Sequence, residues 1–359
     1  MWPDRRIQNL LGVEVPIIQA PMAGAGLTDL AIAVSRTGGL GSLPCALLGP
    51  DQIRAEVGIF RQRTDRPINL NFFCHQPPRP DAAREVAWQQ RVAPYYRELG
   101  LDPEVPAPAS GRAPFDATLC ALVEEMRPEV VSFHFGLPEG ALLDRVAATG
   151  ARILSSATTV GEARWLEAHG CDAIIAQGVE AGGHRGMFRS DDIATQIGTL
   201  SLVPQIVDAV RVPVIAAGGI ADGRGIAAAF MLGAAGVQIG TAYLFCPEAT
   251  IAAPHRHALD DGTRRETALT NVFTGRPARG IVNRVMREIG PMAPEAPAFP
   301  MAGGALAPLR AATEPAGSED FMPLWSGQSA SLGLTMPAGD LTRHLADEAL
   351  ARLAQRTTP

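Results

Sequence analysis

The chain has 359 residues, 47% of them hydrophobic, and its formal net charge is −6 at pH 7. This acidic balance disfavours nucleic acid and anionic membrane surfaces as partners, so a small molecule is the expected ligand. All 31 basic residues are arginine. The absence of lysine excludes Schiff-base aldolases, pyridoxal-phosphate enzymes and Walker-type phosphate loops, because each of them needs a lysine amine.

No segment of the sequence predicts export or membrane insertion. The longest apolar runs are short and interrupted by Gly, Pro or charged residues, and the polar start lacks the apolar core of a secretory signal. We therefore expect a cytoplasmic protein. The five cysteines are odd in number and lack C-x-x-C spacing, which favours reduced core thiols over a disulfide framework or a zinc cluster.

Short runs rich in Val, Ile, Leu and Ala recur along the chain, each followed by a glycine or polar turn and a segment of helical periodicity. Eight such runs are predicted as strands, at 16–20, 39–43, 68–72, 130–135, 152–156, 173–176, 214–217 and 236–239. Strands buried on both faces that alternate with helices are typical of a parallel sheet. Eight such units predict an α/β fold, a closed TIM (β/α)8 barrel. An open nucleotide-binding sheet would carry an early G-x-G-x-x-G, which the first strand lacks.

Two regions fall outside this repeat. Between Cys74 and Cys120 an insertion rich in Pro, Arg and Tyr lengthens the third connection, and a helix is predicted within it at 82–99. After the last strand, residues 246–320 are predicted as a small helical cap followed by an extended connection. The extended part is assigned to the Pro-, Ala- and Gly-rich stretch 290–317.

The end of the chain returns to the pattern of the barrel. Residues 341–356 form an amphipathic segment, predicted as a terminal helix that seals the barrel. Residues 1–245 and 321–359 are therefore assigned to one ligand-binding barrel domain, and residues 246–320 to the cap.

The active site of such a barrel lies at the carboxyl ends of its strands. There, the glycine-rich loops at 217–223 and 238–241 offer backbone amides next to a helix start, which can bind a phosphate monoester without lysine. Ordinary tight turns are the alternative for these glycines. Asn71 and Gln177, at the ends of two other strands, can hydrogen-bond the polar edge of a planar ring. FMN combines such a ring with a phosphate and is the predicted cofactor.

A single imidazole, His184, lies in the glycine-rich turn 178–186 after the sixth strand. We predict that it acts as a general base or hydrogen-bond donor over the cofactor, because an imidazole with a pKa of about 6.5 suits proton abstraction. A turn histidine that caps a helix is the alternative. His134, at the end of the fourth strand, and Arg185 are predicted to contact an anionic substrate, with a structural histidine and a solvated arginine as the alternatives.

Four other polar residues are expected to have structural roles. His255 and His257 lack a third ligand at useful spacing, so no metal site is predicted and both are expected on a surface helix. Glu180 is expected to orient the turn that carries His184, and Asp222 to cap a helix.

The sequence resembles the nitronate monooxygenase family, formerly called 2-nitropropane dioxygenases, and in particular its bacterial class I pattern. The matching pieces are QAPMA at 19–23, NLNFF at 69–73, SFHFG at 132–136, GVEAGGHRG at 178–186, AGGI at 217–220 and PLWSGQ at 323–328. The resemblance implies an FMN-containing barrel with His184 as the catalytic residue. The predicted cofactor contacts are Ala20, Pro21, Met22, Asn71, Gln177, Gly182, Gly218, Gly219, Gln238, Ile239, Gly240 and Thr241.

The reaction that the resemblance implies is oxidation of an alkyl nitronate, such as propionate 3-nitronate, by O2. The products are a carbonyl compound and nitrite, and one electron passes from the nitronate to the flavin. His184 would position the nitronate or deprotonate a neutral nitroalkane. Detoxification of nitro compounds is the expected biological role.

Three other functions are compatible with the same barrel. Two are enzymes, an FMN-dependent enoyl-acyl-carrier-protein reductase and an NADH:quinone reductase, and the third is an inactive flavin-binding or assembly protein. The sequence leaves the oligomeric state open, with a homodimer among the options.

Overall fold

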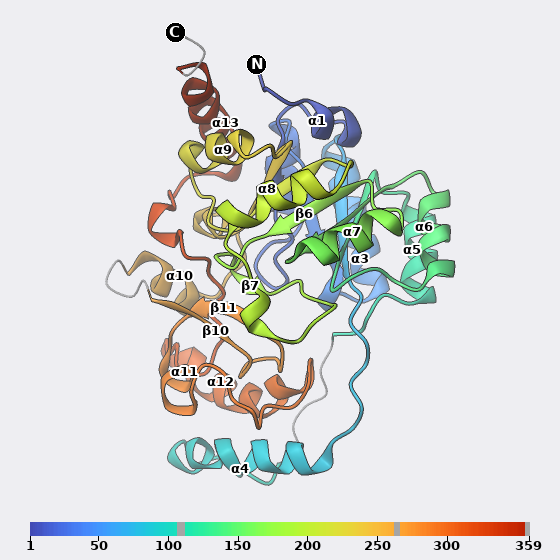
Figure 1. The fold of residues 1–359 in the computed structure, drawn as a ribbon. Coiled ribbons are helices and arrows are strands. Elements are labelled where there is room, and N and C mark those ends of the chain that lie inside the picture. The colour runs from blue at the N-terminus through green and yellow to red at the C-terminus, as the bar shows by residue number, and fades with distance from the viewer. Residues whose placement is uncertain (106–111, 262–265, 356–359) are drawn as a thin grey trace.

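Eight parallel strands form a barrel in the computed structural model, which describes residues 1–105, 112–261 and 266–355 (Figure 1). Their order around the barrel is β1-β9-β8-β6-β5-β4-β3-β2, and the ring closes where Leu40 pairs with Ile18. The strands are β1 (Ile17–Gln19), β2 (Gly41–Pro44), β3 (Ile68–Phe73), β4 (Val130–His134), β5 (Arg152–Ala157), β6 (Ala173–Gln177), β8 (Val214–Ala217) and β9 (Gly236–Ile239). The predicted TIM barrel and its eight strands are confirmed.

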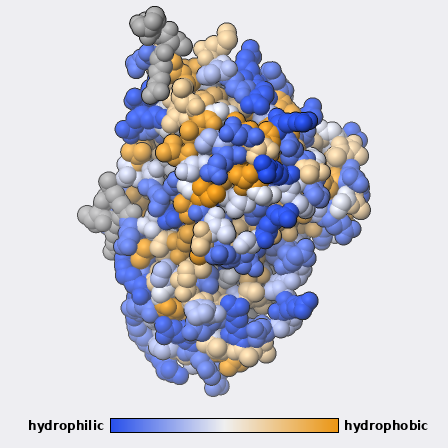
Figure 2. All heavy atoms as spheres, viewed as in Figure 1, coloured by the Kyte–Doolittle hydropathy of each residue, from blue (hydrophilic) through white to orange (hydrophobic). Residues whose placement is uncertain are grey.

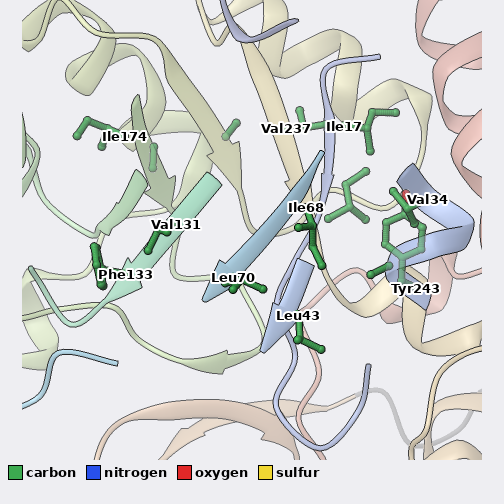
Figure 3. Close-up of a cluster of buried hydrophobic side chains, with 14 of the residues drawn as sticks. Ile17, Val34, Leu43, Ile68, Leu70, Val131, Phe133, Ile174, Val237 and Tyr243 are labelled. Atoms are coloured by element: carbon green, nitrogen blue, oxygen red, sulfur yellow. The ribbon is translucent and has the colours of Figure 1, made fainter. Parts of the chain in front are cut away.

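Burial on both faces explains why the strand sequences are almost continuously apolar. Residues that point outward, such as Ile17 and Val131, pack against the surrounding helices (Figure 3). Residues that point inward, such as Ile18 and Leu154, form a second cluster with Ile7 of helix α1 (Arg6–Leu11). Both sets therefore leave water on folding, and the barrel is a packed core with its opening at one end.

Helices surround the barrel, and the last helix of the chain completes the ring. α13 (Ala338–Ala354) packs against α9 (Gly223–Met231) and α2 (Thr28–Arg36) and buries Leu341 and Leu345. The prediction that the terminal helix seals the barrel is therefore confirmed, although the helix begins earlier than predicted. The other barrel helices are α2 (Thr28–Arg36), α3 (Pro50–Arg63), α5 (Ala117–Met126), α6 (Gly140–Ala148), α7 (Val160–Ala168), α8 (Thr199–Ala209) and α9 (Gly223–Met231).

A cap covers the carboxyl ends of the strands, below the barrel in Figure 1. Helix α4 (Ala82–Glu98), as predicted inside the insertion after β3, packs against it: Trp88 Nε1 donates to the carbonyl of Ala302 (2.9 Å) and the Tyr96 hydroxyl to that of Ala305 (2.8 Å). The remaining cap elements are α10 (Ala253–Asp260), β10 (Thr267–Thr270), β11 (Ala278–Ile281), α11 (Arg284–Ile289) and α12 (Ala307–Thr313).

The extended connection predicted for 290–317 is wrong. A 3-10 helix at Met301–Leu306 leads directly into α12, and its buried Ala302 and Ala305 pack with the aromatic side chains of α4. The composition resembles low complexity, but alanine is the strongest helix former and its small side chain lets helices approach closely.

A small three-stranded sheet joins the cap to the barrel. Its middle strand β11 pairs antiparallel with β10 on one side and with β7 (Gly183–His184) on the other. β7 has two residues and belongs to the glycine-rich turn after β6, so the sequence gives no strand signal for it. This pairing attaches the predicted catalytic histidine to the cap.

The surface in Figure 2 is a mixture of hydrophilic areas and smaller hydrophobic ones over the barrel helices and the cap. None of the described helices has both the length and the hydropathy that a bilayer span requires.

Substitution of Gly41 by alanine should destabilise the protein. A Cβ at this position in β2 would overlap the carbonyl group of Ala31, so helix α2 would have to move away from the sheet. We expect Gly41→Ala to lower the free energy of unfolding by about 1–3 kcal/mol, measured by urea or thermal unfolding. Gly58→Ala in α3 is the control, because nothing lies near its Cβ, and it should raise stability by up to about 1 kcal/mol. Equal effects of the two substitutions would contradict the packing described above.

Candidate active site

A cavity of about 360 Å³ opens between the barrel and the cap, within the size range of cofactor and substrate sites. Every barrel strand contributes to its wall at or just beyond its carboxyl end, which is where the sequence predicts the active site. The apolar part of the wall includes Met22, Leu47, Phe73, Leu244 and Trp325.

Eleven of the twelve predicted cofactor residues line this cavity, together with His184 and His134. The exception is Ile239, whose side chain is buried in the core between the barrel and its helices. Side chains alternate along a strand, so the neighbouring Gln238 points into the barrel while Ile239 points outward. Ile239 supports the cavity wall through its main chain, because its carbonyl accepts a hydrogen bond from the amide of the lining residue Ala20.

Arg185 does not contact the cavity, so its prediction as a substrate-binding residue is wrong. Its guanidinium group is fully buried and donates to the carbonyls of Gly178 and Gln177, both at 2.7 Å, and to Gln196 Oε1 at 2.8 Å. These bonds tie the two ends of the glycine-rich turn together. The solvated arginine given as the alternative is equally wrong.

The glycine-rich loops converge at one end of the cavity. Gly218 and Gly219 both have a positive φ (108° and 70°), a conformation that glycine adopts without strain. The Gly219 carbonyl accepts a hydrogen bond from Ser329, and Gly327 donates to Thr241 Oγ1, so the returning chain closes over the loops. The walls here are mostly main chain, as the predicted phosphate site requires.

The carboxylate of Glu180 links the glycine-rich turn 178–186 to the start of helix α8. It accepts hydrogen bonds from the amide of Thr199 at 2.9 and 3.0 Å and from the Thr199 hydroxyl at 2.7 Å, at the first residue of α8. Asp222 accepts from the amides of Arg224 and Gly225 and caps α9. Both residues have the structural roles that the sequence predicts.

The described cavity wall contains no aspartate or glutamate. It does contain the guanidinium-bearing residues Arg112 and Arg310 and three histidines. Gln238 Oε1 is buried and has no hydrogen-bond partner among the described residues. A cavity with this composition favours an anionic ligand that also carries hydrogen-bond donors.

His184 is held by both its main chain and its ring. Its carbonyl accepts hydrogen bonds from Gln177 Nε2 (2.9 Å) and His134 Nε2 (3.2 Å), and its own Nε2 lies 3.0 Å from Thr274 Oγ1. The ring packs among four aromatic side chains, those of Phe73, Phe135, Phe299 and Trp325. Burial, reinforced by the positive charge of Arg112, lowers the pKa of His184 well below 6.5. The imidazole is therefore neutral at physiological pH.

Both ring nitrogens of His134 are occupied by the protein. A carbonyl can only accept, so Nε2 carries the proton that it donates to His184, and Nδ1 accepts from the Ser156 hydroxyl at 3.0 Å. Burial lowers the pKa of His134 to about 3. This geometry favours the structural alternative, in which His134 supports the main chain of His184.

His255 is not on an exposed surface helix, contrary to the prediction. It is buried in α10, lines the cavity and donates from Nε2 to the carbonyl of Trp325 (3.1 Å), whereas His257 is exposed. The two rings thus lie on different sides of the helix. Arg112, Arg310 and Thr274 could not be predicted from the sequence, because they come from the insertion and the cap, where no recognisable motif marks them.

Comparison with known proteins gives matches over nearly the whole chain. The family model described as nitronate monooxygenase matches residues 4–348. A nitronate monooxygenase of Pseudomonas aeruginosa is 44% identical over 96% of this chain and 98% of that protein. Among solved structures, a nitroalkane oxidase from Streptomyces ansochromogenes has a TM-score of 0.89 and 41% identity, covering 98% of this chain and 99% of that one. FabK from Thermotoga maritima has a TM-score of 0.74 and 27% identity, covering 99% of both chains.

The chain belongs to the nitronate monooxygenase family. The resemblance inferred from the sequence motifs is therefore confirmed, and the protein is an oxidoreductase of a family of flavoenzymes. The nitronate monooxygenase fold places His184 and the glycine-rich loops on the same cavity.

Neutral buried histidines predict a protein that loses stability as the pH falls below 6.5. Burial lowers the pKa of His75 and His255 to about 4 and that of His134 to about 3, whereas unfolded histidine has a pKa of about 6.5. Between these values the unfolded state binds more protons, so stability rises with pH from about 4 to 6.5.

Urea unfolding at intervals from pH 5 to 7 measures this dependence. His255→Gln, which retains a donor toward Trp325, should reduce the linked proton uptake by about one proton. A free energy of unfolding that does not change between pH 7 and 5 would contradict the prediction.

Proposed function

We propose that the protein is an FMN-dependent nitronate monooxygenase that oxidises alkyl nitronates with O2 to a carbonyl compound and nitrite. The observation that carries the proposal is the cavity itself, whose described wall lacks acidic side chains and unites His184 with the glycine-rich loops. Membership of the family supports the reaction class. The arrangement of the loops supports FMN in particular, because it offers main-chain groups to a terminal phosphate.

The residues present fit a flavin mononucleotide. The loops at Gly218, Gly219, Gly240 and Thr241 would hold the phosphate, and the unpaired Oε1 of Gln238 would accept a hydrogen bond from an N–H group of the ring. When bound, the flavin supplies the electron acceptor for oxidation of the nitronate. The chain itself binds the substrate, orients it and excludes water.

Two side chains of the protein would act on the substrate. Arg112 lies close enough to His184 to lower its pKa and lines the same cavity, so its guanidinium would attract the negative charge of the nitronate or of a second acidic group. The imidazole of His184, neutral and surrounded by aromatic rings, would contact the reacting end of the substrate. Desolvation by these rings strengthens the electrostatic contacts.

An FMN-dependent enoyl-acyl-carrier-protein reductase on the same barrel is the weaker alternative. FabK from Thermotoga maritima is less similar to this chain in both sequence and structure than the nitroalkane oxidase from Streptomyces ansochromogenes. Turnover of NADH with a crotonyl thioester, in the absence of nitronate oxidation, would favour this alternative.

Purified protein should be yellow and should release about one FMN per chain on heating, identified by mass. Gln238→Leu removes the acceptor that faces the ring and should weaken FMN binding about tenfold, the value of one hydrogen bond. The control is Gln205→Leu on α8, an exposed glutamine away from the cavity, which should not change FMN affinity. Release of FAD, or an unchanged affinity of Gln238→Leu, would contradict the FMN assignment.

With propionate 3-nitronate the enzyme should consume O2 and release nitrite. Arg112→Met keeps the length of the side chain but removes its charge, so KM for propionate 3-nitronate should rise at least tenfold, and KM for ethyl nitronate, which has no carboxylate, should rise less. Arg97→Met at the exposed end of α4 is the control and should leave both values unchanged. An equal loss on both substrates would show that Arg112 does not bind the carboxylate.

A further inference from the structure

The two nitrogens of His184 have different surroundings. Nε2 lies 3.0 Å from the hydroxyl oxygen of Thr274, a buried residue of the cap that is not part of the cavity wall. The same hydroxyl lies 3.3 Å from the carbonyl oxygen of Arg276. Thr274 therefore has two neighbours, one of which can only accept a hydrogen bond.

A threonine hydroxyl has one proton to donate. The carbonyl of Arg276 can only accept, so donation of this proton to that carbonyl satisfies both groups and leaves the Thr274 oxygen as an acceptor for the second contact. Nε2 of His184 must then carry the proton that the oxygen accepts. In a neutral imidazole with a proton on Nε2, the other nitrogen, Nδ1, has a free lone pair.

The turn that carries Thr274 is anchored to the cap. The amide of Gly275 donates to the carbonyl of Asn271 at 2.7 Å, and the Asn271 side chain exchanges two hydrogen bonds with the main chain of Ala293, at 2.8 and 2.9 Å. Phe299 packs against the His184 ring with centroids 5.3 Å apart, which restricts its rotation. The hydroxyl of Thr274 and the imidazole ring of His184 are therefore held in fixed positions relative to each other.

We propose that Thr274 is a positioning residue that fixes the tautomer of His184, so that Nδ1 acts as the base toward a neutral nitroalkane. This inference rests on the proposed function, and what it adds is the role of Thr274 in proton abstraction from a neutral nitroalkane by His184. Nδ1 takes the proton from the carbon next to the nitro group, the electron pair of the C–H bond passes into the nitro group, and the product is the nitronate. The resulting imidazolium retains the proton on Nε2, which stays hydrogen-bonded to the hydroxyl oxygen of Thr274.

The direct test is the tautomer itself. In ¹⁵N NMR of the holoenzyme, with the His184 signals assigned by their loss in His184→Asn, the wild type should show a protonated Nε2 and an unprotonated Nδ1. Thr274→Val should shift the population toward the other tautomer, and Thr274→Ser should restore the wild-type pattern. Protonation of Nδ1 in the wild type, or an unchanged spectrum of Thr274→Val, would overturn the proposal.

Kinetics separate the role in proton transfer from a general structural role. Thr274→Val should lower kcat/KM for nitroethane at least tenfold and change that for preformed ethyl nitronate by less than threefold, because the nitronate needs no base. Thr270→Val is the matched control: Thr270 is a buried threonine of β10 whose hydroxyl accepts from Val272, and its loss should affect neither substrate selectively.

Equal losses on the two substrates, or a wild type that oxidises ethyl nitronate but not nitroethane, would overturn the proposal. Failure of the wild type on both substrates would instead refute the proposed function, and the NMR measurement would still report whether Thr274 sets the tautomer.

Discussion

The attachment of His184 to the barrel and the cap at the same time is the constraint on which the site depends. The carbonyl of His184 is bound by side chains from two barrel strands, Gln177 of β6 and His134 of β4. His184 is also one of the two residues of β7, which pairs with β11 of the cap. The imidazole is thus fixed relative to both the glycine-rich loops of the cavity and the aromatic rings packed around it. Hydrogen bonds and strand pairing within the protein therefore position this residue from two sides.

Electrostatics give this site its preference for anions, and burial controls the charge on its histidines. The pKa of each cavity histidine is lowered first by desolvation, so the imidazoles contribute no positive charge at neutral pH. The positive charge in the wall comes from Arg112 and Arg310, of which Arg310 pairs with Glu314 at 2.7 Å, and the described lining residues themselves include no acidic side chain. The proposed positions for a phosphate, at the glycine loops, and for a substrate anion, near Arg112, match this distribution of donors along one cavity.

The barrel could be predicted because its signals are local. Each strand is a short apolar run bounded by turn residues, and the cavity loops carry glycines at the strand ends, so position along the chain is enough to place them. Arg185, His255 and Thr274 depend instead on what packs around them after folding. The sequence does not reveal that Arg185 turns back onto the carbonyls of its own loop, or that Thr274 meets His184 across 90 residues. The same limit applies to β7, which exists because of its partner β11.

Segments without a recognisable motif build the cap side of the cavity. The alanine-rich stretch supplies Arg310 to the wall and leads from Phe299, which contacts the His184 ring, into the helices that pack on α4. The insertion supplies Arg112. A substitution in the cap can therefore change the cavity wall without altering the strands or the glycine-rich loops of the barrel. The part of the wall that comes from the cap is also the part for which the sequence carries no recognisable motif.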